Sequence, residues 1–336
     1  MTQSIGGVIC HLSWRPGSFH ATAALFVMAR AADLCENWLL RPARRAVGSP
    51  AISEEEKMGS TRGFLKRHSL IIGLILMFLF TWPQDLSNSG VLPFQVPFLV
   101  YLFLGWGFIA AAVLMTWLTL GRTAVGDLLR RYLKGRVGWK WYAALFIVPV
   151  VQVLGVLLYA GLTRTPLDLS HVFADDLRPP TISRLAFILP FFLFDAISNG
   201  EEIGWRGYVL PRLQARHTAL IAALIGGVIW GFWHLPKFVT HWSTPGFAIF
   251  MLDTMLKSVL LAWLYNGTGG SLLLTVLAHA AWNTTSTFVS SGTTASSENP
   301  GVYALQVLLL LPIVAFIVYR TGAQDLARSM TRQQQD

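Results

Sequence analysis

Residues 198–211 read SNGEEIGWRGYVLP, and this charged stretch lies between two strongly apolar segments. FILPFFLFDAI precedes it, and ALIAALIGGVIWGFW follows shortly after it. Glu201, Glu202 and Arg206 therefore lie within or beside segments that suit a lipid bilayer. Ionisable side chains at membrane depth are costly, so they mark a candidate functional site. The rest of the chain is interpreted as a helical scaffold around this stretch.

The composition is typical of a membrane protein. Of the 336 residues, 54% are hydrophobic and only 13% are charged, whereas soluble domains carry about 25% charged residues. The apolar runs are continuous rather than alternating, which favours membrane helices over a β-barrel. We therefore predict an all-α, polytopic membrane protein.

Eight apolar segments predict about eight transmembrane helices. Lys and Arg are concentrated in alternate loops, which predicts that both termini are cytoplasmic. The style of the chain suggests a bacterial inner membrane protein. The segments are approximately 69–83, 95–120, 142–163, 184–200 (extendable to 213), 218–235, 247–265, 270–289 and 302–319.

Outside this membrane region the sequence changes character. Residues 1–57 are expected to be a disordered extension or an artefact of start-site choice, because Met58 opens a basic stub that leads into the first apolar segment. Residues 58–320 form the predicted membrane domain, and 321–336 a cytoplasmic tail.

Two classes of function are disfavoured by the composition. The two cysteines, Cys10 and Cys35, lie outside the apolar segments, which argues against a disulfide framework or a cysteine metal site. The net charge of +9 is explained by the basic loops. No basic-aromatic module or zinc-finger spacing accompanies it, so we expect no nucleic-acid partner.

Several polar residues lie in or beside the apolar segments. Glu202 and Arg206 have the i,i+4 spacing of a helical ion pair, and Glu201 points about 100° away from that pairing. His279 and Asn283 are also i,i+4, in the middle of the seventh segment. Ordinary structural roles are available, namely a charged helix terminus for the first group and interhelical hydrogen bonding for the second.

Four further polar residues have simpler explanations. His234 follows the aromatic run WGFW, as an interfacial histidine would. Asp253 and Lys257 are i,i+4 and can neutralise each other. Asp195 is a candidate for a supporting role, either through a hydrogen bond to Asn199 or as a cap after a helix break at Pro190.

Together, these side chains contain the groups that peptide-bond hydrolysis requires. A glutamate such as Glu201 can act as general base for water, and His234 can share the proton. His279 and Asn283 can donate hydrogen bonds to a tetrahedral oxyanion. Alternatively, Glu201, His234 and His279 are the donor types of a zinc site with an open position for water. Neither HExxH nor GxSxG is present, so the common zinc-protease helix and the serine elbow are not the source.

Three motifs in order resemble the CPBP family of intramembrane proteases. This family includes the type II CAAX prenyl endopeptidases and the bacterial bacteriocin-processing and Abi-type proteins. The resemblance covers about 184–290, on the fourth, fifth and seventh segments, and Trp230 stands where the family usually has Phe. The motifs are EExxxR (Glu201, Glu202, Arg206), aromatic-xxx-His (Trp230, His234) and HxxxN (His279, Asn283).

The resemblance implies a role for each motif. Glu201 resembles the family's water-activating glutamate, assisted by His234. His279 and Asn283 resemble its oxyanion-stabilising pair, and Glu202 with Arg206 its supporting ion pair. The family has been described both as metal-dependent and as glutamate-dependent without a metal, so a divalent metal such as zinc stays an open alternative.

The predicted function is an intramembrane endopeptidase that cleaves a membrane-associated or secreted peptide or protein. Membrane lipids and the substrate are the expected partners, and no oligomeric state is predicted. The alternatives are a non-catalytic scaffold and a transporter or proton-coupled channel, which the lack of an internal repeat disfavours. The channel would use the same polar residues as a relay: Asp195, Glu201, His234 and His279.

The proposed catalytic residues can meet only if the fourth apolar segment places Glu201 inside the membrane. If that helix ends at residue 200, Glu201 lies at the membrane edge, and His234 lies about 24 Å along the next helix. A helix break at Pro190 and a span of about 191–213 would instead place Glu201 near His279, within about 10 Å. We therefore expect a break at Pro190.

Overall fold

The computed structural model describes residues 61–167, 183–198, 200–238, 244–289 and 299–327. Within these ranges every regular element is a helix, which confirms the predicted all-α fold. All of them belong to one unit, residues 46–336. The predicted extension 1–57 and the end of the tail, 328–336, lie outside the described residues.

The first part of the described chain is built from five helices. A short α2 leads into α3, and α3 packs along α5. The amphipathic α6 follows, with Leu128 buried and basic residues in its last turn. The elements are α2 (Thr61–Arg67), α3 (Ser69–Asn88), α4 (Phe98–Gly105), α5 (Gly107–Leu120) and α6 (Arg122–Tyr132).

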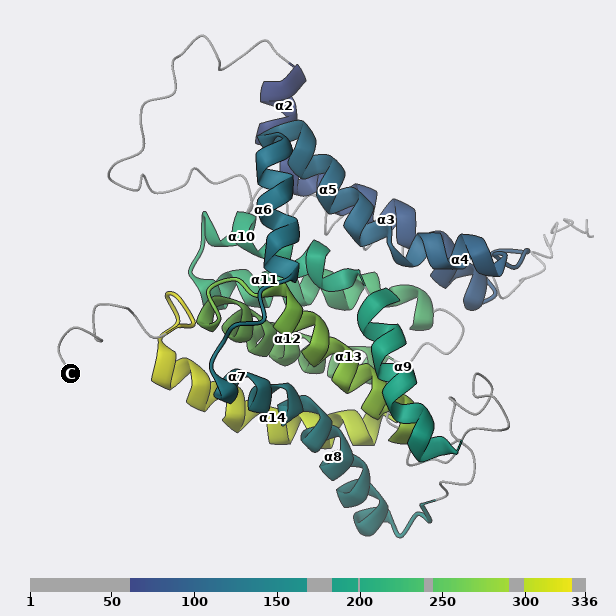
Figure 1. Cartoon of the computed structure of the whole chain (residues 1–336). Helices are drawn as coiled ribbons and strands as arrows, with labels where there is room; N and C mark the ends of the chain where they lie inside the picture. Colours follow the sequence, from purple (N-terminus) through teal and green to yellow (C-terminus); the bar gives the residue numbers. More distant parts are fainter. Residues whose placement is uncertain (1–60, 168–182, 199, 239–243, 290–298, 328–336) are drawn as a thin grey trace, which may run out of the picture. The chain divides into compact units, whose positions relative to one another are not determined.

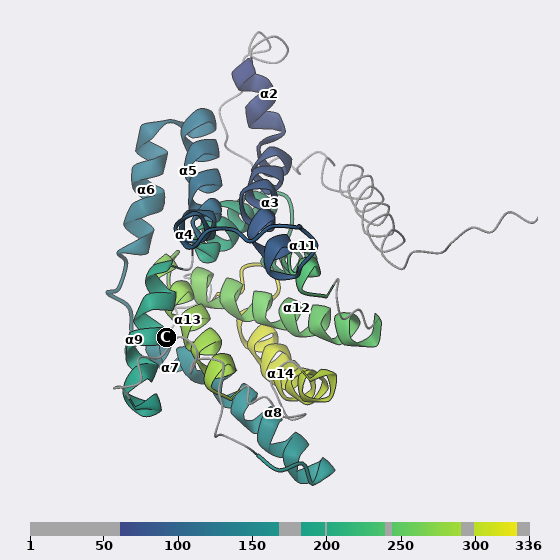
Figure 2. The ribbon, with the colours of Figure 1, turned by 90° about the vertical axis from the view of Figure 1, so that its right-hand side faces the viewer.

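The second part contains the three motif-bearing segments. Figures 1 and 2 show α12 and α13 in the middle of the helical unit, with α8 and α14 on one side of them and α3 and α5 on the other. The elements are α7 (Trp139–Ala143), η2 (Ala144–Phe146), α8 (Ile147–Thr163), α9 (Arg184–Ser198), the π-helix η4 (Ile203–Val209), α10 (Leu210–Gln214), α11 (Ala219–Trp233), η5 (Leu235–Phe238), α12 (Thr244–Gly267), α13 (Leu272–Val289) and α14 (Pro300–Thr321).

Each of the eight predicted apolar segments contains at least one helix, as expected for a polytopic membrane protein. Four segments among the described residues are long and apolar enough to cross a membrane: Ser69–Ser87, Trp139–Thr163, Gly246–Gly267 and Pro300–Thr321. Gly107–Leu120 and Ala219–Trp233 form shorter apolar helices.

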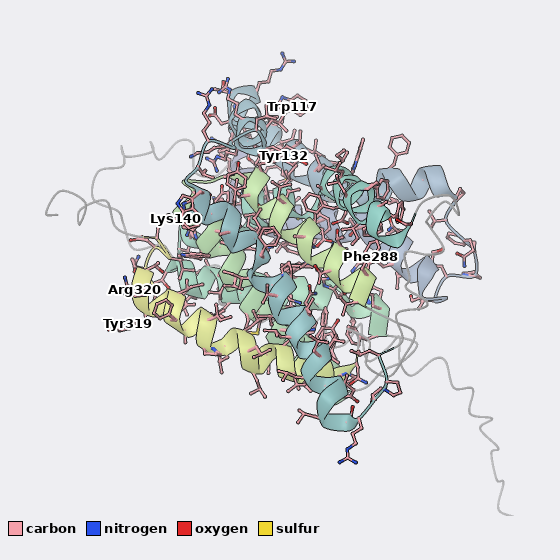
Figure 3. All side chains as sticks on the ribbon, turned by 60° about the horizontal axis from the view of Figure 1, so that its bottom comes forward. Trp117, Tyr132, Lys140, Phe288, Tyr319 and Arg320 are labelled. Carbon is pink, nitrogen blue, oxygen red and sulfur yellow. The ribbon has the colours of Figure 1, made fainter. Side chains whose placement is uncertain are left out.

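Large apolar side chains are exposed on the outside of these helices, as expected where lipid replaces water. Leu162 is 73% exposed, Ile197 is 70% exposed and Tyr319 is 84% exposed. In Figure 3, Lys140, Tyr319 and Arg320 project from the same side of the unit, opposite Phe288. The chain is an integral membrane protein, and the cytoplasmic placement of its termini stays a prediction.

The predicted helix break at Pro190 is wrong. α9 runs from Arg184 to Ser198 with Pro190 inside it, and the interruption falls near Gly200 instead. Proline removes one helical hydrogen bond, but membrane helices tolerate it where neighbouring groups compensate. Gly200 is buried against α5, where an added Cβ would lie 2.6 Å from Ile109 Cγ1. A larger residue at position 200 would therefore require the Ile109 side chain to shift. The π-helix η4 follows three residues later.

Two glycines on α11 allow α12 to approach it closely. A Cβ at Gly227 would lie 2.8 Å from the Cα of Met255, and one at Gly231 would meet the side chain of Met251. The spacing Gly-xxx-Gly places both on one face, a motif that brings membrane helices together. This contact positions α12 next to the helix that carries His234.

We expect Gly227→Ala to lower the free energy of unfolding by about 1–3 kcal/mol, because the new methyl group must displace the backbone of α12. Gly226→Ala is the matched control, since its Cβ would lie 3.8 Å from its nearest neighbour, Ser258 Oγ. The control should be as stable as the wild type or more stable. Thermal unfolding in detergent measures both, and equal melting temperatures for the two variants would contradict this packing.

Candidate active site

The centre of the site is a buried carboxylate, Glu202, with two partners. Arg206 Nη1 donates to Glu202 Oε1 at 2.9 Å, and His279 Nδ1 donates to the same oxygen at 2.9 Å. Glu202 is 0% exposed, Arg206 is 2% exposed and His279 is 3% exposed. The i,i+4 pair expected from the sequence is therefore present, and it also joins the start of η4 to α13.

Glu201 points in a different direction from Glu202. Its Oε2 accepts a hydrogen bond from the indole Nε1 of Trp230 at 2.8 Å. Trp230 is 2% exposed and belongs to α11, whereas Glu201 itself is only half-buried. Of the two adjacent glutamates, Glu202 is fully buried inside the protein, and Glu201 is partly exposed.

His234 is attached to the same tryptophan by the main chain. Its Nδ1 lies 2.9 Å from the carbonyl oxygen of Trp230. A carbonyl only accepts hydrogen bonds, so Nδ1 carries the proton and Nε2 keeps its lone pair. Trp230 thus orients Glu201 through its indole N–H and His234 through its carbonyl. From the sequence, Trp230 is only an unusual aromatic residue in its motif, although its indole N–H, which phenylalanine lacks, is a signal of this role.

Contacts between aromatic rings connect Trp230 on α11 with His279 on α13. The Trp282 ring lies 4.4 Å from the His279 ring and 5.5 Å from the Trp230 ring, with which it stacks. The Arg206 guanidinium lies 4.8 Å from the Trp230 ring centroid, a cation–π distance. Trp282 is not among the predicted site residues, although it lies three residues after His279 and hence on the same side of α13.

Asn283 is hydrogen-bonded to a residue of α9. Its Nδ2 lies 3.2 Å and 3.5 Å from the two carboxylate oxygens of Asp195. Asp195 therefore supports Asn283, a role that neither of its predicted interactions described. Of those two, Asn199 lies outside the described residues, and the helix continues through Pro190.

The predicted zinc ligands are not grouped as a metal site in this geometry. In the described part of the chain, no three His, Cys, Asp or Glu side chains are arranged to hold a metal ion. Glu201 Oε2 accepts from Trp230, and His279 Nδ1 donates to Glu202. A zinc site made of Glu201, His234 and His279 stays a prediction, and no step is derived through it.

Two similarities to known proteins fall on this part of the chain. Residues 181–285 match the family model for type II CAAX prenyl endopeptidase Rce1-like proteins, a range that contains all three motifs. CAAX prenyl protease 2 of Methanococcus maripaludis is 25% identical over 103 residues, which are 28% of this chain and 38% of that relative. The chain thus matches little more than a third of the relative's length. Both similarities confirm the predicted family resemblance and support a membrane protease.

Proposed function

Because residues 181–285 are similar to membrane-embedded CAAX-type proteases, we propose that this protein is an intramembrane endopeptidase with Glu201 as general base. The observation that carries the proposal is the double attachment at Trp230, which orients both Glu201 and His234. Both of these side chains are half-buried. The neighbouring Glu202 is buried and accepts two hydrogen bonds, so we assign it a supporting role.

The first step is attack by water on the substrate carbonyl. Glu201 takes a proton from the water as its oxygen bonds to the carbonyl carbon, which gives a tetrahedral intermediate. The C–N bond then breaks, and the proton passes to the leaving nitrogen. His234 can carry that proton between Glu201 and the leaving nitrogen, because its Nε2 holds a lone pair.

His279 and Asn283 are the candidates for stabilising the oxyanion. Asn283 has two N–H groups, and one is directed at Asp195, which leaves the other for substrate. His279 can donate from Nε2 only when both ring nitrogens carry protons, and the Glu202 carboxylate is the counter-charge for that form. Arg206 donates to the same Glu202 oxygen and places a second positive charge beside that carboxylate. These donors supply the electrostatic part of catalysis.

We propose that the substrate is a peptide segment at the membrane. The assay determines whether this substrate must carry a lipid modification. The purified protein in lipid nanodiscs is incubated with a prenylated CaaX peptide, the same peptide without its prenyl group, and an unrelated membrane-anchored peptide. Mass spectrometry of the fragments identifies the scissile bond. Cleavage of at least one peptide supports the proposal, whereas intact peptides together with pH-driven flux into liposomes would support the channel alternative.

Removing divalent metal is expected to leave cleavage unchanged, because the mechanism proposed above uses only protein groups and water. Zinc content is measured on the purified protein, and the cleavage rate is measured before and after treatment with EDTA or phenanthroline. Phenanthroline-type compounds that do not chelate serve as the control. Loss of activity that zinc alone restores would contradict the metal-free mechanism and favour the set Glu201, His234 and His279.

A further inference from the structure

α12 carries a buried ion pair that the proposed reaction does not use. Lys257 Nζ donates to Asp253 Oδ2 at 2.5 Å, and the two side chains are 9% and 1% exposed. Burying two charges is costly, and well-packed apolar residues often replace such a pair without loss of stability. Mutual neutralisation explains why the pair is tolerated, but it does not explain what the pair does.

The surroundings of the two charges differ. Lys257 Nζ lies 5.3 Å from the ring centroid of Trp282, within the range of a cation–π interaction. Asp253 Oδ1 is buried and has no hydrogen-bond partner among the described residues. Asp253 therefore serves as the counter-ion, and Lys257 makes the contact with the active site.

Trp282 connects this cation to the proposed catalytic groups. One neighbour of its ring is the imidazole of His279 at 4.4 Å, and another is the indole of Trp230 at 5.5 Å. Any rotation of the Trp282 indole would therefore disturb the ring that is proposed to stabilise the oxyanion. A cation near the indole restricts that rotation.

α12 also reaches the second histidine. The Phe250 ring lies 5.1 Å from the His234 ring in an edge-on contact. Phe250 and Lys257 are seven residues apart, two turns along the same face of the helix. This face of α12 thus contacts His234 directly through Phe250, and it reaches His279 through Trp282.

We infer that Lys257 is a positioning residue, whose ammonium holds the Trp282 indole against His279 and so fixes the direction of His279 Nε2. Asp253 keeps the ammonium in place. The inference rests on the proposed peptidase function and deepens it. Helical spacing alone explains Asp253 and Lys257 as a pair that neutralises its own charges. In this inference, the pair also positions a group that takes part in catalysis.

The main test removes both charges together, so that no unpaired charge is left buried. We expect Asp253→Asn/Lys257→Met to fold and to lower kcat roughly 10-fold or more with little change in KM, because misplaced catalytic groups slow the chemical step. Lys257→Arg keeps a cation near the indole and should restore most of kcat. The matched control is Asp127→Asn/Arg130→Met, which removes an exposed ion pair on α6 and should behave as wild type.

Two further variants separate positioning from a purely structural role. The exchange Asp253→Lys/Lys257→Asp keeps an ion pair but moves the cation one turn away from Trp282, so kcat should fall although the pair persists. In a Trp282→Leu background, the double charge removal should lower kcat no further, because the two changes then act on one contact. A merely structural pair would give independent, multiplicative losses instead.

The outcomes distinguish this inference from the function on which it rests. If the wild type cleaves peptide and Asp253→Asn/Lys257→Met keeps the wild-type kcat, the role of Lys257 is overturned and the peptidase proposal stands. Multiplicative losses in the Trp282→Leu background overturn it as well. If the wild type cleaves no peptide, the peptidase proposal fails and this inference fails with it.

Discussion

Replacing Glu201 with glutamine is expected to lower kcat for peptide cleavage about 10²–10⁴-fold, the usual contribution of a general base. The amide cannot take the proton of water, but its carbonyl oxygen can still accept the Trp230 N–H at the position of Oε2. The fold should therefore be preserved, and the loss should appear in kcat rather than in KM. Steady-state kinetics on a peptide substrate in nanodiscs measures both constants.

The control for Glu201→Gln is an acid of the same chain that lies outside the site. Asp127 pairs with Arg130 on the exposed side of α6, and the two side chains are 55% and 76% exposed, respectively. Asp127→Asn should keep the wild-type kcat. If Glu201→Gln retained more than about a tenth of the wild-type rate, another group would have to be the general base.

Replacing Arg206 with methionine is expected to destabilise the protein by about 3–5 kcal/mol, the cost of breaking a buried ion pair by removing one partner. Glu202 is 0% exposed, and after the change its Oε1 would keep only the hydrogen bond from His279. The Trp230 ring would also lose the guanidinium 4.8 Å from its centroid. Thermal unfolding in detergent, followed by circular dichroism, measures the loss.

Two variants test whether loss of the Arg206 charge causes the expected loss of stability. Arg206→Lys keeps a positive charge without the planar fork, so its stability should lie between wild type and Arg206→Met. Glu202→Gln/Arg206→Met removes both charges and should recover stability but not activity, because His279 then lacks its carboxylate. An Arg206→Met melting temperature equal to that of wild type would show that Glu202 is not held by this pair.

Contacts within one helix could be predicted from the sequence because spacing alone determines them. Glu202 and Arg206 are i,i+4, and the pair forms at 2.9 Å. The eight apolar segments likewise followed from composition, since a backbone in lipid must satisfy its own hydrogen bonds. Their order, with a motif on the fourth, fifth and seventh, was enough to indicate the family.

Contacts between helices could not be predicted in the same way. Glu202 and His279 are 77 residues apart in sequence, and Asn283 meets Asp195 across 88 residues. Several pairings of the same acids and histidines were chemically equivalent before the packing was known. The sequence could not show that Glu202, rather than Glu201, faces His279.

The fourth segment shows why local signals can mislead. Proline is the strongest helix breaker in water, so the sequence predicts an interruption at Pro190. The observed interruption lies where Gly200 packs closely against Ile109 of α5, which is a tertiary contact. The expected span of 191–213 is not needed to connect Glu201 with His234, because Trp230 on α11 is hydrogen-bonded to both side chains.

Hydrolysis in isotopically labelled water shows whether Glu201 activates the water that attacks the peptide bond. When the wild type cleaves its peptide in H₂¹⁸O under single-turnover conditions, the new carboxylate of the N-terminal fragment should contain one ¹⁸O atom. Glu201→Gln, shown to be folded by thermal unfolding, should yield almost no labelled fragment in the same time. Equal labelling by wild type and Glu201→Gln, or the absence of any labelled fragment from the wild type, would contradict water activation by Glu201.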